Sequence, residues 1–260
     1  MKPIFPALLL CLMPLATLPA QQPAAPAAAS KEKLPYEIAF SNLPEKTRIE
    51  YLGKVVEAKR FFNEKRIFEA VDKANEANAI FSDDPEVLNL IGACQVEFRN
   101  FEKAMEAFKK ADAQRPNNPQ IFFNIAELNF VTGNWQEAEA NLTKVLKLTP
   151  ATMDKSTFQV NRLTEFKLLL AKLKLNKRAE AVSMATKYDY LDDSPYHYYA
   201  AAALLFDEGK DVEAEGVVAR GTRIFQDANM LAPWQDTMIE FGYIKGFFGG
   251  AGTATPTPAP

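Results

Sequence analysis

Apolar residues in the middle of the chain recur at the spacing of a helix. Within residues 99–116, Ala104, Phe108 and Ala111 stand at i, i+4 and i+7, which places them on one face of a helix. Residues 133–150 repeat the pattern, again with charged residues between the apolar positions. The alternation therefore predicts a series of amphipathic helices.

The pattern returns at a fixed distance along the chain. Ala138 follows Ala104 by 34 positions, and Ala214 follows Ala181 by 33. Ala181 follows Ala138 by 43 positions, so nine residues have been added between those two copies. A period near 34 indicates a chain built from repeated structural units. Five units are predicted, starting near Tyr51, Pro85, Pro119, Arg162 and Pro195.

Each unit has the signals of two helices. A proline follows a capping residue at three predicted starts, which are Asp84-Pro85, Asn118-Pro119 and Ser194-Pro195. The capping oxygen accepts from a free backbone N–H, and proline has no N–H to leave unpaired. Gly133, Asn176 and Gly209 suit the left-handed backbone that ends a first helix. Small residues at Gly92 and Ala104 would let the paired helices approach closely.

In this register the chain resembles the tetratricopeptide repeat family, whose motif is a 34-residue helix–turn–helix. The second unit carries the pattern best, and the register is kept through the third. The resemblance spans about residues 46–227. It implies an all-α, right-handed superhelical solenoid of antiparallel helix pairs, with about five repeats and a C-terminal capping helix. It also implies a concave groove, lined by the first helices, that binds a peptide or protein.

Ten positions are predicted to line this groove, and nine of them are apolar or aromatic. They are Val55, Phe62, Asn89, Val96, Phe123, Phe130, Phe166, Leu173, Tyr199 and Phe206. The family's carboxylate clamp uses Lys, Arg and Asn. At the matching positions this chain has Val55, Gln120, Asn124, Lys59 and Leu90, so the clamp is absent. The apolar row is either a docking surface for a partner segment or a groove filled by the chain itself.

The nine added residues fall near residues 153–161. Ser156 would cap a helix that continues to Leu175, which lengthens the fourth unit's first helix by about two turns. A disordered loop is the alternative. Farther on, Trp234, Met238 and Phe241 stand at i, i+4 and i+7 within residues 232–246. They predict a helix that caps the solenoid, with a membrane-surface helix as the alternative.

The two ends of the chain lack the repeat. Residues 1–20 combine Lys2, an apolar run from Ile4 to Leu18 and small residues near Ala20, which is typical of a signal peptide. A cytosolic apolar N-terminus is the alternative. The run is too short and too rich in proline for a stable membrane span. Residues 21–45 are interpreted as a Pro/Ala-rich linker and lead-in, residues 46–246 as the solenoid, and residues 247–260 as a disordered tail.

Composition changes the picture little. The net charge of −3 does not favour nucleic acid as a partner. Cleavage after Ala20 would leave Cys94 as the single cysteine, expected to be a buried filler rather than a reactive thiol. His197 has no partners at metal-ligand or catalytic spacing, and Asp83-Asp84 and Asp192-Asp193 precede helix starts, where the helix dipole favours negative charge. No catalytic residue, metal site or cofactor is predicted.

The sequence thus predicts an exported protein-interaction module or scaffold, in the periplasm or envelope of a bacterium. Its protein or peptide partner would bind the apolar groove, in a role such as envelope, secretion or pilus assembly. The alternative is a structural subunit of an envelope complex whose groove is filled internally and whose outer face makes the contacts. An enzyme is the third and most distant reading.

Overall fold

A computed structural model describes residues 33–149 and 154–246 of the chain. The predicted signal peptide, residues 21–32 of the predicted linker, residue 153 of the predicted insertion and the predicted tail lie outside these residues. The described chain consists of helices joined by turns, with no strand, and it divides into two compact units. The N-terminal unit comprises the described residues through Asn124, and the C-terminal unit comprises those from Ile125 onward. The predicted all-α repeat fold is confirmed.

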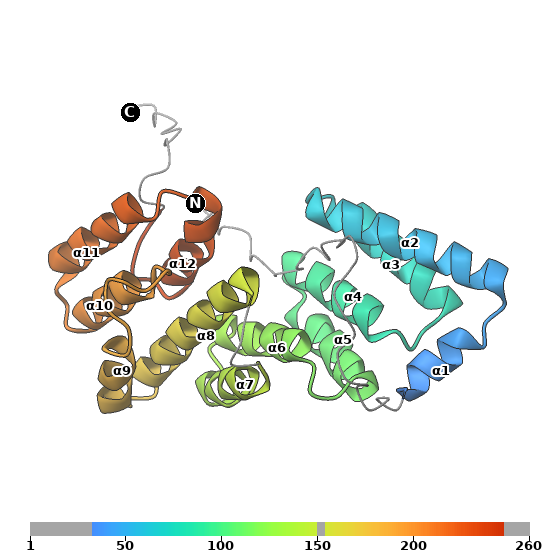
Figure 1. The fold of residues 1–260 in the computed structure, drawn as a ribbon, viewed down its shortest axis with the longest axis horizontal. Coiled ribbons are helices and arrows are strands. Elements are labelled where there is room, and N and C mark those ends of the chain that lie inside the picture. The colour runs from blue at the N-terminus through green and yellow to red at the C-terminus, as the bar shows by residue number, and fades with distance from the viewer. Residues whose placement is uncertain (1–32, 150–153, 247–260) are drawn as a thin grey trace, which may run out of the picture. The chain divides into compact units, whose positions relative to one another are not determined.

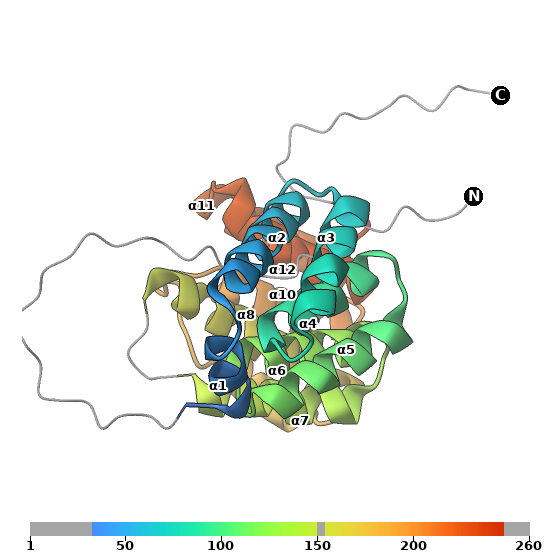
Figure 2. The ribbon, with the colours of Figure 1, turned by 90° about the vertical axis from the view of Figure 1, so that its right-hand side faces the viewer.

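The N-terminal unit is made of two helix pairs preceded by a short helix. Its helices are α1 (Pro35–Ser41), α2 (Glu45–Asn63), α3 (Ile67–Ile80), α4 (Pro85–Glu97), α5 (Phe101–Gln114) and the first part of α6 (Pro119–Val131). Figures 1 and 2 show α2 alongside α3 and α4 alongside α5. The lead-in is thus partly helical, and the Phe40 ring of α1 lies 5.3 Å from that of Tyr51 and 5.5 Å from that of Phe81.

The C-terminal unit continues the pairing. It contains the rest of α6, then α7 (Trp135–Leu148), α8 (Lys155–Lys174), α9 (Arg178–Ala185), α10 (Tyr196–Asp207), α11 (Asp211–Ile224) and α12 (Ala228–Glu240). The added residues lengthen α8, as predicted, and the loop alternative is wrong for residues 155–161. The predicted cap is also wrong, because the carboxylate of Asp154, not Ser156, accepts from the backbone N–H of Thr157 at 2.9 Å.

One turn recurs at the end of each first helix. The second residue beyond the helix has a positive φ in each case, at Lys65, Arg99, Gly133, Asn176 and Gly209, which confirms the three predicted there. In each case the next backbone N–H donates to a carbonyl five residues back, as from Asn100 to Gln95 at 2.8 Å. These are the paired bonds of a Schellman motif, and they reverse the chain into the second helix.

Close packing inside a pair explains the small residues of the motif. A Cβ on Gly92 would lie 2.4 Å from the Phe108 ring, so only glycine fits between α4 and α5 at this point. Ala104 is fully buried on the facing helix. The cap of α4 is also as predicted, since Asp84 accepts from the backbone N–H of Glu86 at 2.7 Å.

Candidate functional site

The ten predicted groove positions are all buried, none being more than 8% exposed. Five belong to the N-terminal unit (Val55, Phe62, Asn89, Val96 and Phe123) and five to the C-terminal unit (Phe130, Phe166, Leu173, Tyr199 and Phe206). The one polar member, Asn89, accepts a hydrogen bond from the Asn124 amide at 2.8 Å. Their role in partner binding stays a prediction.

In the C-terminal unit, α12 and the residues after it cover four of the five predicted groove positions, Phe130, Phe166, Tyr199 and Phe206. The Trp234 ring lies 5.4 Å from Phe166 of α8 and 5.6 Å from Tyr199 of α10. Farther along, Phe241 stacks on Phe130 of α6 at 5.9 Å. Tyr243, just beyond the helix, stacks on Phe206 at 4.9 Å. The chain itself therefore fills the inner face of this unit.

The sequence analysis treated α12 as a cap for the last repeat. Gly242, which follows α12, has a φ of +86° and lies 33 residues after Gly209. The backbone N–H of Tyr243 donates to the Met238 carbonyl at 2.9 Å, which is the bond that ends every earlier first helix. By its position in the repeat period, α12 is thus the first helix of a sixth repeat. Trp234 of α12 and Phe241, the residue just after the helix, nevertheless contact the first helices of three earlier repeats.

Buried charges accompany these aromatic contacts. Lys167 of α8 is 3% exposed, and its ammonium lies 3.0 Å from the Glu127 carboxylate of α6 and 3.8 Å from Glu240 of α12. Burial raises the pKa of Glu127, and attraction to Lys167 offsets only part of that effect. Burial by itself lowers the pKa of Lys167. Attraction to the carboxylates of Glu127 and Glu240 outweighs this effect, so that the pKa of Lys167 is raised. The three groups therefore form a charged cluster inside an aromatic interface.

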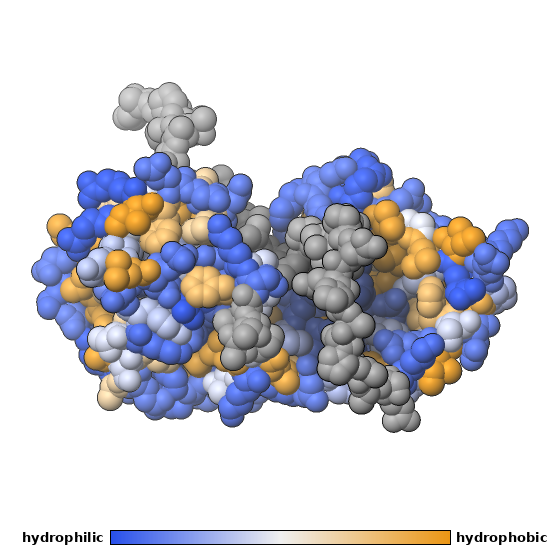
Figure 3. Space-filling view, in the orientation of Figure 1, coloured by the Kyte–Doolittle hydropathy of each residue, from blue (hydrophilic) through white to orange (hydrophobic). Residues whose placement is uncertain are grey.

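The N-terminal unit presents a different surface on α2. Ile49, Leu52 and Val56 are 64%, 49% and 66% exposed, and their i, i+3, i+7 spacing places them on one helix face. Lys59 continues this face, and its ammonium lies 2.7 Å from Glu86 at the start of α4. The apolar stripe thus lies on the side of α2 that borders the next first helix. Figure 3 shows hydrophobic residues at the surface in this part of the N-terminal unit.

This α2 stripe escaped sequence reasoning. Its apolar residues stand at helical spacing, as core residues do, and the pattern alone does not separate a packed face from an open one. Two lysines of α2 close to the stripe have partners within the unit, Lys54 with Glu76 at 2.7 Å and Lys59 with Glu86 at 2.7 Å. The stripe is therefore an apolar surface bordered by internally paired charges.

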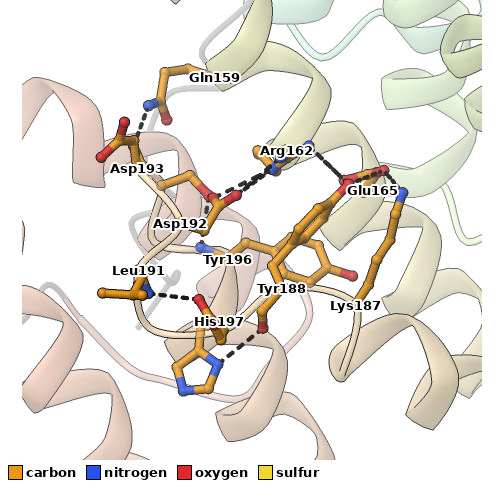
Figure 4. A network of polar contacts seen from close by, with 12 residues as sticks. Gln159, Arg162, Glu165, Lys187, Tyr188, Leu191, Asp192, Asp193, Tyr196 and His197 are labelled. Atoms are coloured by element: carbon orange, nitrogen blue, oxygen red, sulfur yellow. Dashed lines mark hydrogen bonds and ion pairs between the residues drawn. The ribbon is translucent and has the colours of Figure 1, made fainter. Parts of the chain in front are cut away.

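A polar network holds the loop between α9 and α10 (Figure 4). The Arg162 guanidinium donates to the Asp192 carboxylate at 2.9 Å and lies 3.6 Å from the centre of the Tyr188 ring. It also donates to the Tyr188 hydroxyl at 2.9 Å, and that hydroxyl donates to Glu165 at 3.0 Å. Arg162 thus joins α8 to the loop by charge and by stacking.

The candidate catalytic groups of the sequence belong to this network or to helix caps. His197 Nδ1 donates to the Tyr188 carbonyl at 3.2 Å, and Gln159 donates to the Asp193 carbonyl at 2.8 Å (Figure 4). Asp192 accepts from the Arg162 guanidinium at 2.9 Å. Cys94 is buried, as predicted. Over residues 33–149 and 154–246, no group of three or more His, Cys, Asp or Glu residues is placed to hold a metal ion.

No helix in the described part of the chain is long and apolar enough to cross a membrane. On α12, the apolar side chains that would face a bilayer in the alternative reading pack against α6, α8 and α10 instead. In the described residues, α12 is therefore a packed helix of the repeat fold.

Comparison with known proteins agrees with this reading. Residues 95–152 match the family model described as tetratricopeptide repeat. No curated protein sequence matches the chain. Among solved structures, pilF of Pseudomonas aeruginosa is 15% identical, with 76% of this chain and 97% of that chain covered and a TM-score of 0.53. A thermophilic tetratricopeptide-repeat protein of Thermus thermophilus is 17% identical, with 73% and 99% covered and a TM-score of 0.52.

A third similar structure is YrrB, described as a tetratricopeptide-repeat protein with an unusual peptide-binding site. It is 14% identical to this chain, with 76% of this chain and 96% of that chain covered and a TM-score of 0.51. Identities this low establish the fold alone, and the family model that matches describes a repeat rather than an enzyme. The chain thus has the fold of tetratricopeptide-repeat proteins, and its residues 95–152 match the model of that repeat.

Proposed function

We propose that this chain is a protein-interaction scaffold that docks an apolar segment of a partner on the α2 stripe. The observation that carries the proposal is the exposure of Ile49, Leu52 and Val56 on one face of a helix. Burying side chains of this kind against a partner lowers the free energy, because it removes apolar surface from water. The peptide-binding site ascribed to the structural neighbour YrrB adds support from the same fold.

The partner segment that fits is an amphipathic helix or an extended chain with closely spaced apolar side chains. A helix would lay its apolar face along the stripe, as in other helix-in-groove complexes. The bordering cations Lys54 and Lys59 already pair with Glu76 and Glu86. Apolar contact rather than a charge clamp would thus supply most of the affinity.

A second function follows from the filled inner face of the C-terminal unit. A structural subunit of a larger complex would use its second helices, on the outer side, for permanent contacts. Val212 on α11 is 86% exposed and provides a marker for that side. The two functions therefore predict losses of binding at different residues.

The test compares Leu52→Glu plus Val56→Glu with Val212→Glu. Each tagged variant is used to capture partners from an envelope fraction, and bound proteins are identified by mass spectrometry. Docking on α2 requires that the double variant lose a partner that wild type and Val212→Glu retain, with unchanged helical circular dichroism. Loss through Val212→Glu alone would favour the structural subunit.

Groove substitutions such as Phe123→Glu and Phe130→Glu are unsuited to this experiment. Both phenylalanines are buried, at 4% and 2% exposure, so a glutamate there would place an unpaired charge in the core. Loss of a partner would then report unfolding. The α2 positions carry no such penalty because water already reaches them.

We also propose that the protein is exported to the periplasm or envelope of a bacterium. Its partner would then be another protein of that compartment, in envelope, secretion or pilus assembly. The support is the pattern of residues 1–20, with Lys2, the apolar run and the small residues near Ala20. Fusing residues 1–30 to a phosphatase active only outside the cytoplasm tests export. Mass spectrometry of the mature chain should find its N-terminus at Gln21, and an intact Met1 would contradict cleavage.

A further inference from the structure

A cleft of about 580 Å³ opens in the C-terminal unit beside the first turns of α8. Three segments form its walls, namely the start of α8, the loop between α9 and α10, and the connection from α11 to α12. The lining residues are Lys155, Phe158, Gln159, Asp193, Phe225 and Met230. None of the ten predicted groove positions is among them, and the volume falls within the range of about 300–1,000 Å³ typical of small-molecule sites.

The added residues of the fourth repeat build one wall of this cleft. Lys155, Phe158 and Gln159 all fall within the segment added near residues 153–161. Their i, i+3 and i+4 spacing places them on one face of α8. A repeat of ordinary length would lack these positions, so the cleft is a feature of this chain and not of the repeat in general.

Polar and stacking contacts fix the walls relative to one another. The Gln159 amide donates to the Asp193 carbonyl at 2.8 Å, which joins α8 to the loop (Figure 4). The guanidinium carbon of Arg162 lies 4.5 Å from the centre of the Phe158 ring. Arg162 also donates to Asp192 of the same loop at 2.9 Å. The cleft is therefore formed before any ligand enters it, as is usual for ligand sites.

The lining combines apolar side chains with two charges of opposite sign. Phe158, Phe225 and Met230 are half-buried, so each keeps apolar surface that a ligand would remove from water. Lys155 and Asp193 are exposed, and neither charged group has an ion-pair partner among the described residues. A ligand that carries both a carboxylate and an ammonium would pair with both of them.

We propose that this cleft binds a small zwitterionic ligand with an apolar body, the chemistry shared by an apolar amino acid and a short apolar peptide with free ends. The ligand carboxylate faces Lys155, and its ammonium faces Asp193. Its apolar group covers Phe158, Phe225 and Met230. The site lies in a different compact unit from the α2 stripe and does not depend on docking there.

Isothermal titration calorimetry of the full-length protein tests the proposal, with L-phenylalanine and the dipeptide phenylalanyl-phenylalanine as probes. We expect saturable binding, and the tighter of the two probes identifies a free amino acid or a peptide as the source of the ligand. N-acetyl-L-phenylalanine lacks the ammonium, and L-phenylalaninamide lacks the carboxylate. Each should bind about three- to tenfold more weakly than L-phenylalanine, because charges at an exposed rim contribute modestly. Glycine, which lacks the apolar group, should show no saturable binding.

Two substitutions assign the charged groups of the ligand to their partners. Lys155→Gln should remove the difference in affinity between L-phenylalanine and its amide, and Asp193→Asn should remove the difference from the N-acetyl form. Both residues are exposed, so helical circular dichroism should not change. Lys109→Gln on α5 and Asp211→Asn on α11 change equally exposed charges outside the cleft, and they should leave all affinities unchanged.

Absence of saturable binding for both zwitterionic probes would overturn the proposal. Binding that Lys155→Gln and Asp193→Asn leave unchanged would overturn it as well, because the probe would then bind outside this cleft. Leu52→Glu plus Val56→Glu should retain the wild-type affinity for the probes. Loss of the cleft and loss of docking on the α2 stripe are therefore measured separately.

Discussion

Replacing Gly92 by alanine gives the sharpest test of the packing within a repeat. The added Cβ would lie 2.4 Å from Cε1 and 2.6 Å from Cδ1 of Phe108, whereas carbon atoms in contact settle about 3.5–4.0 Å apart. Phe108 is fully buried, so its ring has no open space into which to move. Overpacking of this kind costs about 1–3 kcal/mol of unfolding free energy.

Gly53 supplies the matched control in the same unit. It lies inside α2, and a Cβ there would meet nothing within 4 Å. Gly53→Ala should stabilise the protein by about 0.5–1 kcal/mol, because alanine is the better helix former. Gly92→Ala gains the same helix propensity, so the difference in unfolding free energy between the two variants measures the clash with Phe108 alone. It should equal about 1–3 kcal/mol.

Urea unfolding followed by circular dichroism measures this difference, with an unchanged m-value as the check that the unfolded state is the same. Phe108→Leu should abolish most of the extra cost of Gly92→Ala, since it removes the atoms that clash, and a double-mutant cycle quantifies that coupling. Equal midpoints for Gly92→Ala and Gly53→Ala would refute the close approach of α4 and α5.

Three further predictions concern single positions. Ala104→Leu, in the buried contact of α5, should cost about 1–3 kcal/mol by overpacking, whereas the exposed Ala113→Leu should cost far less; urea midpoints compare them. Arg99→Gly should raise the unfolding free energy by about 0.5–1 kcal/mol, because Arg99 has a φ of +60° that glycine adopts without strain, and thermal melts measure it. Burial raises the pKa of the Cys94 thiol to about 12, so iodoacetamide at pH 8 should modify it only when the chain unfolds, as mass spectrometry would detect.

The helix pairs were predictable because their signals are local. Proline after a capping residue, a left-handed residue after the first helix and alanine at close contacts all recur with the period. The cap of α8 shows the limit of such signals, since Asp154 and Ser156 both suit a helix start and only the backbone decides between them. Helix α1 lies before the repeat and gave no periodic signal.

The candidate sites were less predictable because they depend on contacts between distant segments. The ten groove positions were identified by register, but burial depends on what covers them. For Phe166 and Tyr199 it is Trp234, which belongs to a later repeat of the same compact unit. A signal for α12 was present in the 33-residue step from Gly209 to Gly242. That step reveals a sixth first helix, although it does not say where the helix docks.

The buried charges beneath α12 lead to a final prediction about unfolding free energy. Lys167 is 3% exposed and Glu127 is 6% exposed, so neither charge is solvated if its partner is removed. Lys167→Met should cost about 3–5 kcal/mol at pH 8, because it leaves the Glu127 carboxylate unpaired in the core. Lys167→Met combined with Glu127→Leu should return to within about 1 kcal/mol of wild type, since an apolar pair is often as stable as a buried ion pair.

The pH dependence separates this explanation from a simple loss of packing. Burial already raises the pKa of Glu127 in the wild type, and removal of Lys167 raises that pKa further. The folded variant then binds a proton at a higher pH than the unfolded chain does, so its stability increases as the pH falls toward the ordinary glutamate pKa. The cost of Lys167→Met should therefore shrink between pH 8 and pH 5, whereas the double variant should show no such change. Urea midpoints at both pH values measure it, and a cost that is the same at pH 5 and pH 8 would mean that Glu127 is not a buried charge that depends on Lys167.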